Sequence, residues 1–388
     1  MKKEIIILGS TGSIGQNTLK IIKANKKDFS IKILSTNKNI NKILAQAKEF
    51  KVKNIFISNF KKYLEAIKKN KNKNIKIYNN FNEIDKVMIK KKVYYSMIAI
   101  SGLDGLKPTL KLTKYSKNLA VVNKESLICG WDLIKKNLDK YKSNFIPIDS
   151  EHFSIFSLLN HSNVNYIEKV YITASGGPFI NFPKKNFNKI KPKDALKHPN
   201  WKMGKKISVD SATLMNKVFE VIEAKNIFNL NYNKISILTH PKSYIHAIIK
   251  FKNGLTKIVA HDSDMKIPIY NSFYLQNIKN INTNPLNLKI LNNLNLKAVD
   301  TKKFPLVKLL SKLPHQSSLF ETVLITINDY LVFKFLDNKI NFQKLIDLIY
   351  RISNFREFQK YKKIKPKSVD DIYQLRDYVS FKLDSLGI

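Results

Sequence analysis

The chain has 388 residues, enough for two or three domains at ~100–200 residues each, and its 44% apolar and 11% aromatic residues exclude a disordered chain. Its single cysteine, Cys129, excludes an internal disulfide and a cysteine-ligated metal site, so we expect folding in a reducing compartment. The formal charge of +40 would suit a nucleic-acid-binding protein, but the excess is nearly all lysine, and no nucleic-acid-binding motif accompanies it. A solvated lysine-rich surface, which would also attract anionic substrates, is the favoured interpretation.

Short apolar runs alternate with longer amphipathic stretches over roughly the first 150 residues, which is typical of βαβ units on a parallel sheet. We expect strands at residues 4–8, 31–34, 54–57, 96–100, 119–122 and 145–148. The first run is shorter than the ~7–15 apolar residues of a secretory signal. Because no later run approaches the ~18–20 residues of a membrane span, we expect a cytoplasmic protein.

A glycine-rich segment, Gly9-Ser10-Thr11-Gly12-Ser13-Ile14-Gly15, follows the first expected strand and precedes the amphipathic stretch 16–24. Glycines let the backbone turn tightly and approach a pyrophosphate, which binds at the N-terminus of the following helix. The spacing is G-x-x-G-x-x-G instead of G-x-G-x-x-G, so a glycine turn that binds nothing is the alternative. The strand before it and the helix after it favour a dinucleotide site.

The end of the second expected strand bears on the choice of cofactor. NAD-binding proteins usually carry Asp or Glu there, which accepts a hydrogen bond from the ribose 2′-hydroxyl. Here the segment reads Ser35-Thr36-Asn37-Lys38-Asn39, with no acid and one cation. A 2′-phosphate is attracted by a lysine and repelled by a carboxylate, so the sequence predicts NADPH.

Carboxylates occur at Asp149 and Glu151, directly after an expected strand, and at Glu220, on an expected helix. A pair of acids at i and i+2 converges on one cation when the chain turns, and oxygen ligands select hard cations such as Mg²⁺ or Mn²⁺. Most such pairs are solvated surface acids, which is the alternative. Acids are scarce in this chain, 29 against 69 basic residues, which favours the metal site.

Phosphate-binding groups surround Glu220 in the sequence. Asn216 and Lys217 lie on the same expected helix, Ser211 lies at its start, and Ser175 belongs to a Ser-Gly-Gly turn. Such donors suit a phosphate, although either serine taken alone would be read as a turn residue or a helix N-cap. The segment His198-Pro199-Asn200-Trp201-Lys202-Met203-Gly204 is a poor helix or strand, and we expect a lid over a substrate.

The chain is expected to comprise four parts. The fold class is α/β, with an N-terminal Rossmann-like parallel sheet (1–148), a central α+β catalytic and dimerisation domain (149–277), a linker (278–303) and a C-terminal helical domain (304–388). In the last part, apolar residues recur at helical spacing, at Leu319, Val323, Leu324, Ile327, Leu331 and Val332.

These motifs together resemble the 1-deoxy-D-xylulose 5-phosphate reductoisomerase family in their order and spacing. The resemblance rests on residues 9–15, 123–126, 147–152, 173–179 and the long block 196–224, and it continues at 240–243 and 265–269. It covers roughly residues 1–275, whereas the stretch 325–329 only loosely resembles the family's asparagine-rich helix. Asn37 departs from the glycine that the family often has there.

The resemblance implies a role for each matching residue. As metal ligands it implies Asp149, Glu151 and Glu220. It implies that Lys124 and Ser150 contact substrate oxygens and that Ser175, Ser211, Asn216 and Lys217 bind the substrate phosphate, with His198 alongside as a further substrate-binding residue. As cofactor-binding residues it implies Thr11, Gly12, Ser13, Ile14, Asn37, Lys38, Asn39, Asn123, Glu125 and Gly204. Trp201 and Met203 would lie on the closing lid.

The implied activity is the NADPH-dependent conversion of 1-deoxy-D-xylulose 5-phosphate to 2-C-methyl-D-erythritol 4-phosphate, the committed step of the non-mevalonate isoprenoid pathway. The implied cofactors are NADPH and Mn²⁺ or Mg²⁺, with Co²⁺ as a further candidate. The resemblance also implies a homodimer, for which the apolar helices after Phe304 offer a surface. The rival hypotheses are a dehydrogenase of similar fold that reduces without rearrangement, and the lysine-rich nucleic-acid-binding protein.

Overall fold

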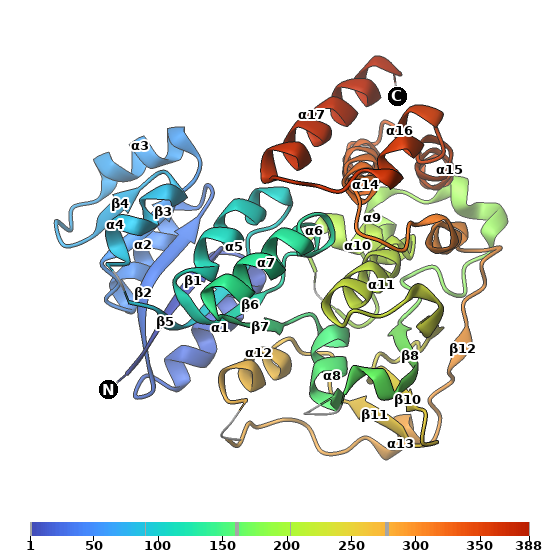
Figure 1. Cartoon of the computed structure of the whole chain (residues 1–388), viewed down its shortest axis with the longest axis horizontal. Coiled ribbons are helices and arrows are strands. Elements are labelled where there is room, and N and C mark those ends of the chain that lie inside the picture. The colour runs from blue at the N-terminus through green and yellow to red at the C-terminus, as the bar shows by residue number, and fades with distance from the viewer. Residues whose placement is uncertain (1, 90, 160–162, 202, 276–278, 388) are drawn as a thin grey trace. The chain divides into compact units, whose positions relative to one another are not determined.

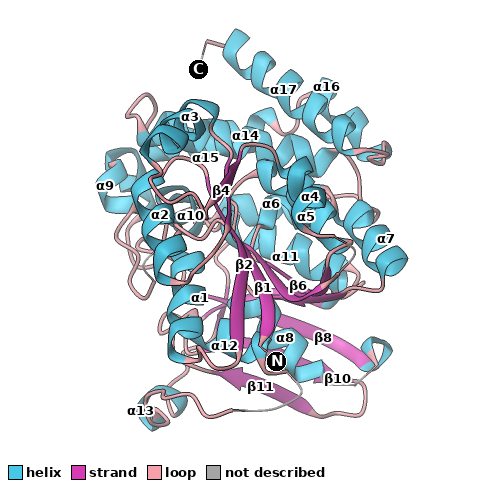
Figure 2. Ribbon diagram, turned by 90° about the vertical axis from the view of Figure 1, so that its left-hand side faces the viewer, coloured by secondary structure: helices cyan, strands magenta, loops and turns pink. Residues whose placement is uncertain are grey.

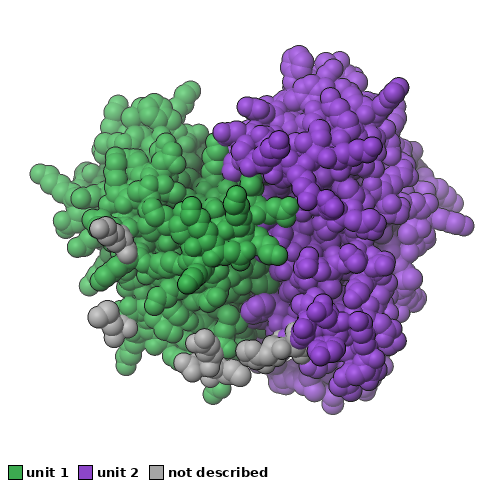
Figure 3. Space-filling model, viewed as in Figure 1, with its two compact units in different colours: residues 1–126, 132–149, 265–281 green, residues 127–131, 150–264, 282–388 purple. Residues whose placement is uncertain are grey.

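The computed structural model describes residues 2–89, 91–159, 163–201, 203–275 and 279–387. It divides into two compact units, which Figure 3 distinguishes by colour. Unit 1 comprises Met1–Ser126, Asp132–Asp149 and Met265–Ile281, and unit 2 comprises Leu127–Trp131, Ser150–Asp264 and Asn282–Ile388. None of the described helices combines the length and apolar composition that crossing a bilayer requires.

Unit 1 is built on a parallel seven-stranded sheet in the order β4-β3-β2-β1-β5-β6-β7, with helices around it (Figure 2). Its strands are β1 (Lys3–Leu8), β2 (Phe29–Thr36), β3 (Asn54–Ile57), β4 (Lys76–Tyr78), β5 (Val93–Ile98), β6 (Ser116–Val121) and β7 (Asn144–Pro147). Its helices are α1 (Ser13–Ala24), α2 (Ile40–Glu49), α3 (Phe60–Lys69), α4 (Ile84–Val87), α5 (Leu106–Thr113) and α12 (Lys266–Phe273), with the first half of α6 (Lys124–Cys129) and nearly all of α7 (Trp131–Tyr141). All six expected strands are present, and β4 is the strand that the apolar pattern did not predict.

The core of unit 1 also contains a segment from much later in the chain. Ile269, Tyr270 and Phe273 of α12 are buried in the same hydrophobic cluster as the strands, and the hydroxyls of Tyr95 and Ser272 are 2.7 Å apart in the interior. The chain therefore leaves unit 1 after β7 and returns to it at α12. The expected domain boundary at residue 277 falls outside the described residues.

Unit 2 combines a five-stranded sheet, in the order β11-β10-β8-β9-β12, with helices. Its strands are β8 (Ile167–Ala174), β9 (Ile235–Thr239), β10 (Ile245–Phe251), β11 (Thr256–Ala260) and β12 (Lys297–Ala298). Its helices are α8 (Ser150–Leu159), α9 (Pro192–Ala195), α10 (Lys205–Ala212), α11 (Met215–Ile227), α13 (Leu288–Leu291), α14 (Phe320–Leu336), α15 (Phe342–Ile352), α16 (Arg356–Gln359) and α17 (Val369–Ser385). The expected linker contains α13 and β12, and β12 pairs with β9.

The C-terminal helices pack around α14, which contacts α15 and α17 (Figure 1). Helix α14 is apolar on most sides, and most of its residues are buried, as expected for a central helix. Its first turn contains Glu321, whose carboxylate accepts hydrogen bonds from the backbone N–H (3.1 Å) and hydroxyl (2.6 Å) of Ser318. Burial raises the pKa of Glu321 to about 7, because an apolar surrounding disfavours its charged form.

Replacing Glu321 by Gln is therefore expected to stabilise the protein above neutral pH. The folded protein holds the Glu321 proton up to about pH 7, whereas the unfolded chain releases it near pH ~4.3. The contribution of this group to folding thus falls as pH rises between these values. Glutamine retains the acceptor without the charge, so E321Q should gain roughly 1–3 kcal/mol relative to wild type between pH 5 and pH 8.

Thermal unfolding midpoints of E321Q and wild type, measured from pH 5 to pH 8, test this. The exposed Glu168, changed to Gln, is the matched control, and its difference from wild type should stay small. If the difference in unfolding midpoint between E321Q and wild type did not change with pH, Glu321 would not be protonated in the folded protein up to about pH 7.

Candidate active site

The glycine turn of unit 1 has the tight geometry that its sequence predicts. Gly9 has φ +81°, and a Cβ atom there would lie 2.3 Å from the carbonyl oxygen of Ala99. A Cβ atom at Gly15 would lie 2.4 Å from the carbonyl oxygen of Gly9, so α1 packs directly against the turn. Gly12 is the N-cap of α1, which leaves the first N–H groups of this helix available to an anion.

The expected cofactor residues of unit 1 lie at the carboxyl ends of β1 and β2. The hydroxyls of Thr11 and Thr36 are 2.7 Å apart, and Ser13 and Ile14 form the first turn of α1. The segment after β2 is exposed: Asn37, Lys38 and Asn39. Asn39 also caps α2 by accepting a hydrogen bond from the N–H of Lys42 (3.2 Å). The turn and the lysine thus share one edge of the sheet, where open α/β folds bind ligands.

The segment 123–125 lies after β6 in the same unit. The Asn123 amide donates hydrogen bonds to the carbonyl oxygens of Ile100 and Gly102, which holds the loop after β5. Lys124 forms an ion pair with Asp149, and both side chains are mostly buried. Glu125 is buried in α6.

Three carboxylates converge around the start of α8. Asp149 directly precedes this helix, Glu151 lies in its first turn, and Glu220 lies on α11. Each offers an oxygen within 4.8 Å of the others, and Glu220 is only 1% exposed. Negative charges this close and this buried repel strongly. An all-oxygen donor set at this spacing fits a hard divalent cation.

Lys217 offsets part of this charge. Its ammonium lies 2.7 Å from Glu151 Oε1 and 2.5 Å from Glu220 Oε2. Burial acts to lower the pKa of Lys217, but the two carboxylates outweigh it and the pKa is raised, so the ammonium stays charged. Asn216 donates to the other oxygen of Glu220 (2.5 Å), and the Ser150 hydroxyl donates to Glu151 (2.5 Å).

His198 is held as a neutral ring beside Ser175. Its Nδ1 accepts hydrogen bonds from the backbone N–H groups of Asn200 (3.1 Å) and Trp201 (2.9 Å), so Nδ1 carries no proton. Nε2 is then the protonated nitrogen and donates to the Ser175 hydroxyl oxygen, 3.0 Å away. Burial and then the nearby charge of Lys217 lower the pKa of His198 to about 4, which agrees with this tautomer.

Ser175 and Ser211 are brought together by a glycine. Gly177 has φ +64°, and a Cβ atom there would lie 2.9 Å from the carbonyl oxygen of Ser211, so the turn that carries Ser175 contacts the end of α10. Ser211 itself is buried near the C-terminus of α10.

The expected lid connects α9 to α10 in unit 2. The Asn200 side chain donates to Pro241 O (2.7 Å) and Ser243 Oγ (2.9 Å), and the Trp201 ring meets His246 edge-on with centroids 6.1 Å apart. Met203 is half-buried, and Gly204 is the exposed N-cap of α10. Lys202 lies outside the described residues.

Sequence reasoning did not assign His152 and Glu223. His152 is fully buried, and its Nε2 lies 2.9 Å from the carbonyl oxygen of Glu220. Its Nδ1 lies 3.9 Å from Glu223, which is 1% exposed. Together with Asp149 they form a second group whose possible ligand atoms lie within 4.8 Å of one another. The available signal was the spacing of Glu220 and Glu223, which puts both on one face of α11.

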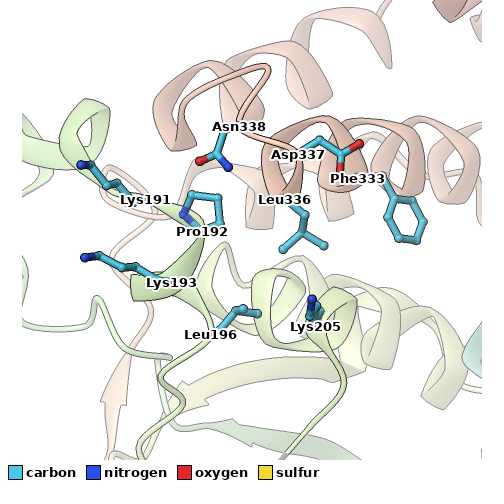
Figure 4. Close-up of a pocket in the computed structure, with 9 residues that line it drawn as sticks. All are labelled: Lys191, Pro192, Lys193, Leu196, Lys205, Phe333, Leu336, Asp337 and Asn338. Atoms are coloured by element: carbon cyan, nitrogen blue, oxygen red, sulfur yellow. The ribbon is translucent and has the colours of Figure 1, made fainter.

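A pocket of about 650 Å³ lies elsewhere in unit 2 (Figure 4). It is lined by Lys191, Pro192, Lys193, Leu196, Lys205, Phe333, Leu336, Asp337 and Asn338. None of the candidate site residues described above lines it, and its lining lacks the clustered carboxylates and serines. We therefore place the chemistry at the carboxylate cluster.

The parallel sheet carries a glycine turn of the kind that binds a dinucleotide phosphate, and the buried carboxylates form a set suited to a divalent metal ion. Together these features are typical of a dinucleotide-dependent oxidoreductase with a metal site. Models of protein families match three parts of the chain: 1-deoxy-D-xylulose 5-phosphate reductoisomerase over residues 5–130, its C-terminal domain over 145–228, and the DXP reductoisomerase C-terminal domain over 262–379. A reductoisomerase of this name from Pelagibacter ubique (strain HTCC1062) is 53% identical over 387 residues, covering 100% of both chains. One from Sulfurihydrogenibium sp. (strain YO3AOP1) is 38% identical over 371 residues, covering 96% of this chain and 94% of that protein.

Solved structures agree over the whole chain. The reductoisomerase from Zymomonas mobilis in complex with NADPH has 27% identity and a TM-score of 0.88, covering 100% of this chain and 99% of that one. A reductoisomerase in complex with NADPH, fosmidomycin and magnesium has 29% identity and a TM-score of 0.89, covering 99% of each. The chain belongs to the 1-deoxy-D-xylulose 5-phosphate reductoisomerase family. The resemblance inferred from the motifs, the α/β fold class and the enzyme class are confirmed.

Replacing Lys217 by Met should destabilise the metal-free protein by about 3–5 kcal/mol, because it removes the ammonium group that contacts both buried carboxylates, Glu151 and Glu220. Thermal unfolding in the presence of a chelator measures this. Lys250→Met is the matched control: its ion pair with Glu168 is exposed (44% and 46%) and should contribute less than about 1 kcal/mol. Equal losses in the two variants would contradict a buried charge cluster.

Proposed function

We propose that this chain catalyses the NADPH-dependent, metal-assisted rearrangement and reduction of 1-deoxy-D-xylulose 5-phosphate to 2-C-methyl-D-erythritol 4-phosphate. The observation that carries this proposal is the convergence of Asp149, Glu151 and Glu220 on one small region. Membership of the reductoisomerase family supports it, and so do the NADPH and magnesium complexes of the related structures.

Asp149, Glu151 and Glu220 would hold Mg²⁺ or Mn²⁺, with Co²⁺ as a further candidate. The bound cation supplies a Lewis acid that lowers the cost of negative charge on the ketone and hydroxyl oxygens of the substrate. Lys217 now contacts one oxygen of Glu151 and one of Glu220. A cation held by these carboxylates would compete with the Lys217 ammonium, which would then be available to the substrate phosphate.

The hydrogen bonds around Ser175 leave its hydroxyl proton available. The Ser175 oxygen accepts from His198 Nε2 (3.0 Å) and from the N–H of Gly177 (3.1 Å). Its own O–H then points to a further acceptor, for which a phosphate oxygen is suited. Ser211, Asn216 and Lys217 would supply the remaining donors to the phosphate.

Lys124 and Ser150 would contact the reacting end of the substrate. The Lys124 ammonium, paired with Asp149, would stabilise charge on the substrate oxygens or move a proton. Trp201 and Met203 would close over the bound substrate and exclude water.

The expected cofactor residues would bind NADPH. The backbone around Thr11, Gly12, Ser13 and Ile14 would hold its pyrophosphate, and Asn37, Lys38 and Asn39 its adenosine 2′-phosphate. Asn123, Glu125 and Gly204 would complete the site. In this division of labour, residues 1–148 would supply most of the dinucleotide site, residues 149–277 most of the metal and substrate site, and the helices after residue 304 would support them. A reducing, cytoplasmic location fits the single, buried Cys129.

NADPH oxidation by the purified protein with 1-deoxy-D-xylulose 5-phosphate and Mn²⁺ or Mg²⁺ tests the proposal. We expect oxidation that stops with a chelator and is far slower with NADH. Glu220→Gln should lower kcat on the order of 100-fold, because a lost metal ligand weakens the Lewis acid. Glu168→Gln, at an exposed position, is the control.

Two outcomes would contradict the proposal. A well-folded protein that oxidises no NADPH under any metal would reject the activity. Unchanged turnover in E220Q would instead indicate a dehydrogenase that reduces without rearrangement and needs no carboxylate-bound metal.

The edge strand β11 suggests how a homodimer would form. β11 is one of the two outer strands of the unit 2 sheet. Ile258 in β11 is 48% exposed, and Leu255, directly before the strand, is 59% exposed. An exposed apolar edge strand is a template for pairing with a second copy. We propose this edge, rather than the helices after Phe304, as the dimer surface.

Ile258→Asp should convert the dimer to a monomer of 45.0 kDa, because it buries a charge in the interface. Light scattering after gel filtration measures the mass. Phe381→Asp, at an exposed position on α17 (69%), should remain dimeric. The reverse result, a monomeric F381D and a dimeric I258D, would assign the interface to the C-terminal helices.

A further inference from the structure

The position of α10 controls the spacing of two candidate phosphate-binding residues. This helix has the lid before its first residue and Ser211 near its last. At that end its backbone contacts Gly177, two residues after Ser175. Any movement of α10 therefore changes the distance between Ser211 and Ser175.

Helix α10 also packs against α9, α11 and α14. Figure 4 shows Lys205 of α10 and Leu336 of α14 lining the same pocket, and α10 makes polar contacts with α14. Asp210, next to Ser211, is 2% exposed and accepts a hydrogen bond from the side-chain amide of Asn328 (2.8 Å). Asn328 is itself fully buried in the middle of α14. Asparagine is a poor helix former and is costly to bury without partners, so packing alone does not account for it.

Lys206 holds the preceding turn of α10. Its ammonium lies 2.7 Å from Asp329 Oδ1 on α14 and 3.5 Å from Asp210 Oδ2 on its own helix. It also lies 5.7 Å from the ring centroid of Phe219, the residue before Glu220. Asn328 and Asp329 thus hold two successive turns of α10, and the same network reaches the helix that carries the carboxylate Glu220.

We propose that Asn328 and Asp329 are positioning residues for the substrate-phosphate site. Through their contacts with Asp210 and Lys206, they hold α10 in the position at which Ser211 and Ser175 can both bind one phosphate group. Neither contacts the substrate, so their effect is on its binding more than on the chemical step. The inference rests on the proposed function, because the phosphate role of the two serines does.

Asn328→Leu, which keeps the branched shape of the side chain and removes the donor, tests the proposal. We expect KM for 1-deoxy-D-xylulose 5-phosphate to rise roughly tenfold, equivalent to about 1.4 kcal/mol, because Ser211 is no longer held in place. The KM for NADPH and kcat should change little. Asp210→Asn combined with Asn328→Asp reverses donor and acceptor, and should recover most of the loss that each single change causes.

Thr326→Val is the matched control for a general loss of stability. Thr326 is buried in the same helix, and its hydroxyl bonds the carbonyl oxygen of Thr322 (2.7 Å) within α14. This variant should be destabilised without a change in KM for the substrate. An equal rise in KM for T326V and N328L, or no rise in N328L, would overturn the proposal.

Hydrogen exchange of the α10 amides separates this proposal from the proposed function, because it needs no turnover. Exchange across residues 205–212 should be faster in N328L than in T326V or wild type. If wild type failed to convert the substrate, the proposed function would fail. Faster exchange in N328L would still support the role of Asn328 and Asp329 in holding α10 in place, and unchanged exchange in N328L would overturn that role.

Discussion

The proximity of Asp149, Glu151 and Glu220 is the constraint on which the rest of the candidate site depends. Buried like charges repel, and a buried ion pair is seldom retained for stability alone, since well-packed apolar residues often do as well. Here the charge is offset by Lys217, which contacts Glu151 and Glu220 at 2.7 and 2.5 Å, and by hydrogen bonds from Asn216 and Ser150. Helix α11 makes this possible because the i, i+3 and i, i+4 spacing puts Asn216 and Lys217 beside Glu220.

The same cluster shifts the pKa values of two nitrogen bases in opposite directions, because their surroundings differ. Lys217, between two carboxylates, has its pKa raised, whereas His198, half-buried and facing that ammonium, has its pKa lowered to about 4. One group stays charged and the other neutral across the physiological range. A charged donor and a neutral, fixed tautomer are therefore available together, and such divergence between neighbouring groups is typical of catalytic sites.

Local patterns predicted the elements well and the long-range packing poorly. Each expected strand overlaps an observed one, and the helical spacing from Leu319 to Val332 corresponds to α14. The strand β4 has three residues, too few for an apolar pattern to stand out. Helix α12 returns to unit 1, where the hydroxyls of Tyr95 and Ser272 form a hydrogen bond although they lie 177 positions apart in the sequence. No local sequence pattern predicts this return. In the site, the residue types were readable, but the contact of Gly177 with Ser211 and the burial of His152 and Glu223 depend on tertiary structure.

Lysine serves two different purposes in this chain, and composition does not distinguish them. Most of the +40 charge is solvated, and exposed pairs such as Lys250 with Glu168 contribute little to stability. Lys217 is 6% exposed, and there the same ammonium group offsets the charge of two buried carboxylates. Lys206 is intermediate, joining α10 to α14 at a partly exposed position. The net charge alone therefore does not reveal what an individual lysine does, because that depends on the groups around it in the folded chain.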